Sequence, residues 1–414
     1  MSIVTPPIFS WEAVYRLHNG AKIDLRQVCS AVGGDEASRH GIILAKSQLA
    51  KKAGVQTGEP LFMARQKCAN VGEKLILVPP RYDLYLQCSN AMIELLKEYT
   101  PFIQRYSVDE CFLDFTNAVD SYSEALALGH RIKDRIKKEL GFCVSVGISS
   151  NKLLAKTCSE FGKDSVHTLY PFEIEEKMWP LPIEDLFMVG RKTKAKLINN
   201  FGINTIGDLA NFNVDLLKYK LKSHGELIWQ YANGIEASEV RKSNFIEMKG
   251  MGNSTTSSWN IEDEKEARLF ILSLSETLGM RLRNSHNLCS LVAISIRYSD
   301  FRGCSKQRKL ASTTNVTSTI AETAFTLFKE LWDGMPIRHI GVSISHLSKD
   351  EYTQLTLFDE KNIEKKKNLD KALDEIRYKF GNKAIVRSCF LESGIRPMTG
   401  GIGDDDYPVM SSIL

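Results

Sequence analysis

The sequence predicts an α+β protein of several domains, on the basis of its length and of two changes in pattern along the chain. The 414 residues exceed the roughly 100 to 200 of one domain, so two to four domains are expected. Between about residues 30 and 165, short apolar runs alternate with helical stretches. From about 166 to 240 short helices are separated by glycine turns, and from 251 to 350 strands and helices alternate again.

Local signals place the elements of the first part. Ser121 and Glu124 have capping-box spacing at the start of a helix that runs to Leu140. Two short apolar segments flank Asp109 and Glu110, which predicts a hairpin with carboxylates at its bend. The other expected elements are strands at Gly41–Ala45 and Phe142–Ile148, and helices at Ser47–Ala53, Tyr82–Tyr99 and Asn151–Phe161.

The second half begins with a polar tether at residues 241 to 250. A net charge of +4 is too modest to identify a polyanion binder, so only local clusters of cations are informative. One such cluster, without any acid, is expected in a loop between strands at Phe301–Leu310. The expected elements are helices at Glu264–Arg283, Ile320–Trp332 and Asn362–Phe380, with a last strand at Ile340–His346.

Composition argues against a membrane protein. Hydrophobic residues make up 43% of the chain, and no apolar run approaches the roughly 18 to 20 residues that cross a bilayer. Met1–Trp11 lacks the basic start and apolar core of a signal peptide. The nine cysteines are scattered without a CxxC pair, which favours reduced packing residues. We expect a cytoplasmic monomer without a membrane partner.

The acids Asp109 and Glu110 are the first candidate site. At a tight bend two neighbouring carboxylates can converge on one point, which suits a hard divalent cation. A pair of acids on a hairpin is by itself more often a solvated turn, so the surrounding sequence has to decide.

Four segments supply that context. Ser107–Asp114 (Ser-Val-Asp-Glu-Cys-Phe-Leu-Asp) and Ser145–Lys156 resemble two signatures of the Y-family DNA polymerases. Ala31–Lys46 and Ala50–Gly58 resemble segments on the fingers side of the same family. The four occur in the order that the family has, and the resemblance covers about residues 30 to 390.

The resemblance implies a right-hand polymerase. Its palm and fingers would span residues 1–165, a helix-hairpin-helix thumb 166–240, an α/β little finger 241–350, and a C-terminal tail 351–414. The implied activity is template-directed, error-prone DNA synthesis past lesions, with damaged primer-template DNA and deoxynucleoside triphosphates as substrates and two Mg²⁺ ions as cofactors.

Site residues follow from the matched positions. Asp109 and Glu110 would be the catalytic metal ligands, and a cation at Lys163 would offset charge on the transferring phosphates. The alternative for the lysines is a plain surface position. The implied nucleotide contacts are Ser47, Gln48, Lys51 and Lys163.

The N-terminal segment departs from the family. Relatives carry a metal-binding Asp in their first strand, whereas here Glu12 is the first acid and Pro6 and Pro7 interrupt the segment. Ser10–Glu12 would be the following turn, and Ile8 or Phe9 lies nearest to the steric gate. Either the reading frame was started or joined elsewhere, or a ligand is lost, and the loss would give a catalytically impaired homologue that binds DNA and the sliding clamp.

DNA contacts are implied in the thumb and the little finger, with a solvated basic surface as the alternative. Gln354-Leu-Thr-Leu-Phe358 resembles the bacterial sliding-clamp peptide, with Gln354, Leu355, Leu357 and Phe358 as its contacts. A nucleotide cyclase with a palm-type fold would explain the acidic hairpin but not this peptide. The implied DNA-binding residues are Gly190, Arg191, Lys192, Lys194, Lys249, Arg302, Lys306, Arg308 and Lys309.

Overall fold

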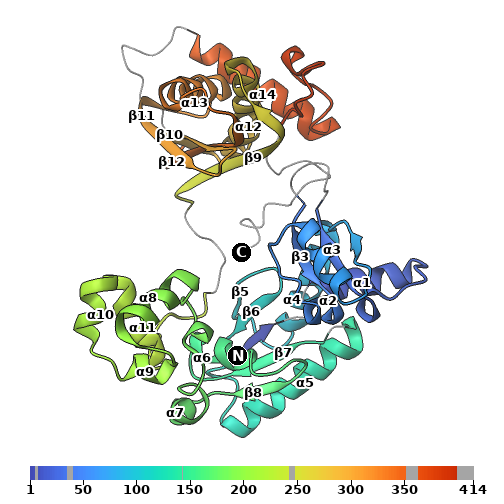
Figure 1. Ribbon diagram of the computed structural model, residues 1–414, viewed down its shortest axis with the longest axis vertical. Helices are drawn as coiled ribbons and strands as arrows, with labels where there is room; N and C mark the ends of the chain where they lie inside the picture. Colours follow the sequence, from blue (N-terminus) through green and yellow to red (C-terminus); the bar gives the residue numbers. More distant parts are fainter. Residues whose placement is uncertain (5–7, 35–40, 142, 242–247, 351–361, 399–414) are drawn as a thin grey trace.

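The computed structural model describes residues 1–4, 8–34, 41–141, 143–241, 248–350 and 362–398 (Figure 1). A five-stranded sheet with the order β5-β6-β1-β7-β8 organises the N-terminal half. Its neighbours are antiparallel except for the parallel pair β7 and β8. The strands are β1 (Ser2–Val4), β5 (Ile103–Arg105), β6 (Glu110–Leu113), β7 (Ser145–Ile148) and β8 (Val166–Thr168).

Helices pack on both faces of this sheet. On one face, α5 (Tyr122–Leu140) buries Ile132 beside Val146 of β7, with α4 (Tyr82–Lys97) next to it. On the other face, α6 (Lys152–Ser159) lies against Gly147, where an added Cβ would overlap the Ala155 carbonyl oxygen and come within 2.7 Å of the Ser159 nitrogen. Glycine at this position therefore sets how closely α6 approaches the sheet.

A second, three-stranded sheet has the order β3-β2-β4 and lies beside the first (Figure 1). Its buried core includes Cys29, Ile43 and Leu61. The elements are α1 (Ile8–His18), a 3-10 turn η1 (Leu25–Gln27), β2 (Ser30–Gly33), β3 (Ile43–Lys46), α2 (Gln48–Lys52), α3 (Leu61–Asn70) and β4 (Ile76–Val78).

The turn expected at Ser10–Glu12 is wrong, because these residues lie inside α1. Phe9 and Ala13, one helical turn apart, are buried in a common core, and Trp11 is buried beside Tyr85 of α4. Such spacing favours a helix that packs on two neighbours over a turn.

The next segment is a small helical bundle whose core includes Leu154 and Cys158 of α6. Helix α6 therefore contributes side chains to the core of the bundle while Cys158 also contacts carbonyl oxygens of β7 and β8. Its elements are η2 (Pro171–Glu173), α7 (Ile174–Lys177), η3 (Ile183–Asp185), α8 (Arg191–Phe201), α9 (Ile206–Ala210), α10 (Val214–Leu221) and α11 (Ser223–Ala232).

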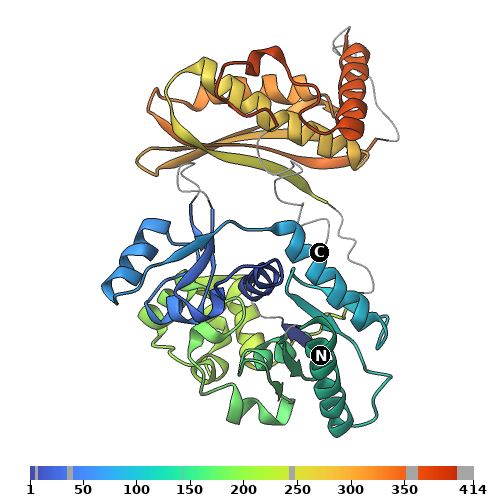
Figure 2. The same cartoon turned by 90° about the vertical axis from the view of Figure 1, so that its right-hand side faces the viewer.

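A four-stranded antiparallel sheet with the order β11-β10-β12-β9 forms the last part. Helices α12 and α13 cover one of its faces and leave the other open (Figure 2). Its elements are β9 (Gly250–Ile261), α12 (Glu264–Asn284), β10 (Asn287–Tyr298), β11 (Gly303–Thr314), α13 (Thr317–Leu331) and β12 (Ile337–Lys349), followed by α14 (Ile363–Phe380) and η4 (Ser388–Phe390).

The loop expected at Phe301–Leu310 is wrong, because most of these residues lie in β11, which begins at Gly303. Its residues pair in continuous register with β10, from Gly303 opposite Arg297 to Lys309 opposite Leu291. Only the short turn before Gly303 connects the two strands. No helix in the described part of the chain is long and apolar enough to cross a membrane.

Candidate active site

The acidic hairpin forms as predicted. Strands β5 and β6 pair with Arg105 opposite Cys111, and the Tyr106 backbone N–H donates to the Glu110 carbonyl oxygen at 2.9 Å. In the bend, the Ser107 hydroxyl donates to an Asp109 carboxylate oxygen at 2.5 Å. Both carboxylates are partly exposed, so solvent and small ions can reach them.

A lysine from α6 lies against this pair of acids. The Lys156 ammonium is 2.7 Å from Glu110 Oε2, and both side chains are mostly buried, at 17% and 19% exposed. The same ammonium lies 5.4 Å from the Tyr106 ring centroid and 5.9 Å from that of Phe187. Glu110 therefore already has a cationic partner, held in place by two aromatic rings.

The first strand supplies no acid to this site. Val4 lies opposite Glu110 on one side and opposite Ser145 on the other, and Ile3 is fully buried. The position from which a central strand would present a carboxylate beside Glu110 therefore carries an apolar side chain. Residues 5–7, which follow directly, lie outside the described part.

Glu12, the first acid of the chain, has a structural role. Its carboxylate is fully buried and accepts a hydrogen bond from the Tyr85 hydroxyl at 2.9 Å, while Arg16 contacts it at 2.5 Å. Burial raises the pKa of Tyr85 well above its usual range. Glu12 thus joins α1 to α4 rather than facing the hairpin.

Two neighbouring carboxylates are the donors that the hairpin offers to a cation such as Mg²⁺. Among the described residues, no group of three or more His, Cys, Asp and Glu side chains could hold a metal ion. Mg²⁺ is, however, commonly held by one or two carboxylates together with water and substrate phosphates. Asp109 and Glu110 are two neighbouring, partly exposed carboxylates of this kind, and both expected ions stay predictions.

Lys163 lies at the same end of the five-stranded sheet as Glu110. Strand β7 begins there, and the Ser145 hydroxyl donates to the Gly162 carbonyl oxygen at 2.9 Å. Lys163 itself is exposed, whereas the next residue, Asp164, pairs with Lys137 at 2.8 Å. Because Val4 of β1 lies opposite both Glu110 and Ser145, the fold brings a solvent-facing lysine to the end of the sheet at which Glu110 lies.

Of the nucleotide contacts predicted beside the second sheet, one is buried and two are exposed. Ser47 is buried and caps α2, because its hydroxyl accepts from the Ala50 N–H at 3.1 Å and the Ser30 N–H at 3.2 Å. Gln48 and Lys51 are exposed and available to a ligand. Burial, and next the Lys51 charge, lower the pKa of the neighbouring Lys46.

The helix-hairpin-helix is present in the bundle. The Ile183 N–H donates to the Asn204 carbonyl oxygen at 2.9 Å, which closes the unit, and Gly190 is the N-cap of α8 without a side-chain cap. Arg191 and Lys192 are exposed in the first turn of α8. Lys194 differs, because it pairs with Glu184 at 2.6 Å.

The predicted cations of the last sheet do not form one patch. Lys306 and Arg308 lie on the face that the helices cover, where Glu330 of α13 contacts them at 3.0 and 2.5 Å. Lys309, one residue on, projects to the open face, since side chains alternate along a strand. Arg302 pairs with Asp300 at 2.6 Å in the preceding turn. Lys249 is exposed just before β9.

The predicted clamp residues Gln354, Leu355, Leu357 and Phe358 lie outside the described residues. Two further residues of interest were missed by sequence reasoning. Lys156 stands out only as a cation on a helix whose other positions are mostly buried, and Glu330 lies on an amphipathic helix with no local sign of its partners.

Family models identify two parts of the chain. Residues 12–160 match the impB/mucB/samB family, and residues 248–357 match the C-terminal domain of that family. DNA polymerase IV of Clostridium acetobutylicum is 47% identical over 390 residues, which cover 94% of this chain and 97% of that protein. The chain belongs to the Y-family of DNA polymerases.

Other similarities agree with this family. DNA polymerase IV 2 of Bacillus subtilis is 37% identical over 368 residues, 87% of this chain and 88% of that protein. A solved Y-family DNA polymerase chimera, Dbh-Dpo4(243-245)-Dbh, superposes with a TM-score of 0.68 at 22% identity, covering 83% of this chain and 98% of that one. The fold is thus the right-hand arrangement expected, with the first two sheets as palm and fingers, the bundle as thumb and the last sheet as little finger.

Proposed function

We propose that this chain is a template-directed DNA polymerase that copies damaged template, with the Asp109–Glu110 hairpin as its catalytic centre. One observation carries the proposal: within a Y-family chain, the fold brings both acids and the exposed Lys163 to the same end of the central sheet. Hydrolytic or cyclase chemistry has no comparable support in the family to which the chain belongs.

The chemistry follows from the charges. Asp109 and Glu110 would hold Mg²⁺, which when bound supplies positive charge to the reacting phosphates and favours the deprotonated primer hydroxyl. Lys163 would neutralise charge on the departing phosphates, and exposed Gln48 and Lys51 would orient the triphosphate. Lys156, which pairs with Glu110 here, would have to release this carboxylate for it to hold the cation.

DNA contacts are proposed on two surfaces. The first turn of α8 offers backbone N–H groups together with Arg191 and Lys192, the arrangement that binds a phosphate at a helix N-terminus. In the little finger, the open face carries Arg297 and Lys309 among small residues such as Ser295 and Ser305. Small side chains permit a close approach of the DNA backbone, which the two cations would neutralise.

A tether to the sliding clamp is proposed for Gln354–Phe358. The support is positional: the peptide follows β12, the last strand of the little finger, and combines apolar anchors with a polar Gln. Its deletion should spare distributive synthesis and abolish stimulation by the clamp. Equal stimulation of the deleted and intact chains would reject this part of the proposal.

Primer extension on undamaged and lesion-containing templates tests the main proposal. The unmodified chain should extend the primer, whereas Asp109→Ala and Glu110→Ala should reduce extension by at least about a thousandfold and leave DNA affinity unchanged. DNA affinity is measured in parallel by fluorescence anisotropy, so that a folding defect is not mistaken for a catalytic one.

A second candidate function is a DNA- and clamp-binding homologue with impaired catalysis. It is favoured by Val4 and Ile3, which place no carboxylate beside Glu110, and by the Lys156 ammonium that already pairs with Glu110. Tight DNA binding by the unmodified chain without any primer extension would select this candidate over the first.

A further inference from the structure

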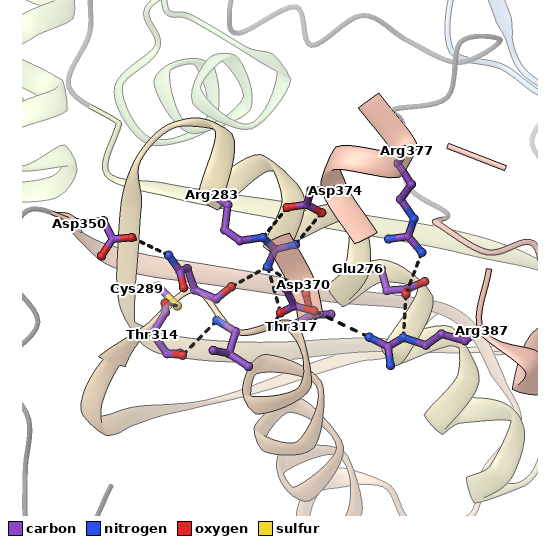
Figure 3. A network of polar contacts seen from close by, with 12 residues as sticks. Glu276, Arg283, Cys289, Thr314, Thr317, Asp350, Asp370, Asp374, Arg377 and Arg387 are labelled. Atoms are coloured by element: carbon purple, nitrogen blue, oxygen red, sulfur yellow. Dashed lines mark hydrogen bonds and ion pairs between the residues drawn. The ribbon is translucent and has the colours of Figure 1, made fainter. Parts of the chain in front are cut away.

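Helix α14 is attached to the little finger through its charged face (Figure 3). Asp370 and Arg377, two turns apart, are 4% and 3% exposed. The Asp370 carboxylate accepts the Thr317 backbone N–H at 2.7 Å, and the Arg377 guanidinium donates to the buried Glu276 of α12 at 3.1 Å. The start of α13 and the middle of α12 are therefore both fixed to α14.

Two further arginines complete this attachment. Arg283 makes a two-point contact with Asp374, at 2.6 and 3.0 Å, and reaches Asp370 at 3.2 Å. Arg387, after the helix, donates to Glu276 at 2.8 Å. Buried charges paired in this way hold a defined geometry, because separating them leaves an uncompensated charge. Helix α14 is thus a fixed part of the little finger.

Because α14 is attached through charged residues, several of its apolar side chains are left exposed. Leu369, Ile376 and Phe380 have the spacing i, i+7 and i+11 of one helical stripe, and they are 53%, 37% and 66% exposed. A surface helix ordinarily buries such a stripe and exposes its charges. Here the polarity is reversed, so the stripe is presented on a rigid support rather than used for folding.

The place of α14 in the chain and its charges indicate what covers the stripe. Phe358, the last residue of the proposed clamp peptide, precedes Ile363 by five residues, a span of at most about 17 Å when extended. Lys365 and Lys379, both exposed, border the stripe at helical spacings of four and three residues from it. A protein that holds the peptide is thus within reach of an apolar, positively rimmed surface.

We propose that the stripe formed by Leu369, Ile376 and Phe380 is a second contact for the sliding clamp. On the clamp, the stripe would meet a shallow apolar surface with acidic residues at its rim, next to the groove that binds Gln354–Phe358. Anchors at i, i+7 and i+11 match the way in which amphipathic helices dock into grooves. The inference rests on the proposed clamp tether and adds to it a second surface.

The test compares clamp affinity among full-length variants. Leu369→Gln combined with Phe380→Gln should lower affinity for the purified bacterial sliding clamp by about tenfold. Tyr378→Ser is the matched control: Tyr378 is 91% exposed on the same helix, away from the stripe, and the variant should bind as the wild type does. Circular dichroism verifies that all three chains are folded.

A third arm separates this inference from the tether itself. Leu357→Ala with Phe358→Ala should abolish most clamp binding. If that variant loses affinity while the stripe variant binds as the wild type does, the second contact is overturned and the tether stands. If the wild-type chain does not bind the clamp, both are rejected. Light scattering measures the oligomeric state of both chains. If the wild type is a dimer and the stripe variant a monomer, the stripe binds a second copy of the chain instead of the clamp.

Discussion

At the level of single residues, the two acids of the hairpin could be predicted from the sequence, whereas the lysine that pairs with Glu110 could not. Asp109 and Glu110 stand between two apolar segments, a signal contained in a dozen neighbouring residues. Lys156 lies 46 residues from Glu110, and its contact depends on the way α6 crosses the sheet. Glu12 shows the converse, because its buried contacts with Tyr85 and Arg16 arise from a helix where a turn was expected.

Replacing Lys156 tests the role of this cation. In Lys156→Met, Glu110 loses its ion-pair partner, so a divalent cation no longer competes with an ammonium. The affinity for Mn²⁺, measured by electron paramagnetic resonance without substrate, should rise about two- to fivefold, as expected for a partly exposed pair.

The matched control is Lys152→Met, one turn earlier on α6. The Lys152 ammonium instead contacts Gln104 and the Glu239 carbonyl oxygen. Because the ion pair between Lys156 and Glu110 stays in place, this replacement should leave Mn²⁺ affinity unchanged. Equal Mn²⁺ affinities in wild type and Lys156→Met would show that Lys156 does not compete with a divalent cation for Glu110.

At the level of elements, sequence patterns located most helices and strands but not the partners of their faces. The caps of α2, α5 and α6 were readable, because Ser47, Ser121 and Asn151 bond to backbone groups three residues away. The basic stretch of β11 was assigned to a loop because consecutive cations hide the alternation of a strand, and only its pairing with β10 reveals it. The reversed polarity of α14 depends likewise on arginines from other elements.

Gly147→Ala should show how strongly the close contact between β7 and α6 is required. The added methyl group overlaps backbone atoms of Ala155 and Ser159, which cannot move without shifting the helix. The free energy of unfolding should fall by about 3 kcal/mol. Gly303→Ala, where the nearest atom is 3.5 Å away, is the control and should change thermal stability little in the same calorimetric measurement.

Glu330→Gln tests the sequence prediction that Lys306 and Arg308, on the helix-covered face of the edge strand β11, also contact DNA. Arg308, and then Lys306, hold the pKa of Glu330 below its usual range, so the carboxylate is charged at neutral pH and pairs with both cations. Without this charge both cations become available to phosphates. DNA affinity should rise about two- to fivefold, and the dependence of log affinity on log salt should steepen by about one unit.

Anisotropy titrations over a range of KCl concentrations measure both quantities. Glu322→Gln, on an exposed position of the same helix, is the control. An unchanged salt dependence in Glu330→Gln would mean that Lys306 and Arg308 do not meet DNA.

At the scale of the whole molecule, the order of sequence signatures anticipated the arrangement of the parts. The four signatures lie in the palm and fingers, whose strands interleave along the chain, and the similar chain of 47% identity spans nearly the whole length. What the sequence could not provide is the environment of the proposed metal ligands, where Val4 and Lys156 occupy the places beside Glu110. The central claim therefore concerns catalysis by this arrangement.

The most direct measurement is rapid-quench incorporation of a single nucleotide by the unmodified chain, with each of the four template bases and with increasing Mg²⁺. Incorporation should follow the template base, require Mg²⁺, and fall at least about a thousandfold in Asp109→Asn. Absence of incorporation by the unmodified chain bound to primer-template DNA, or an equal rate in Asp109→Asn, would contradict it.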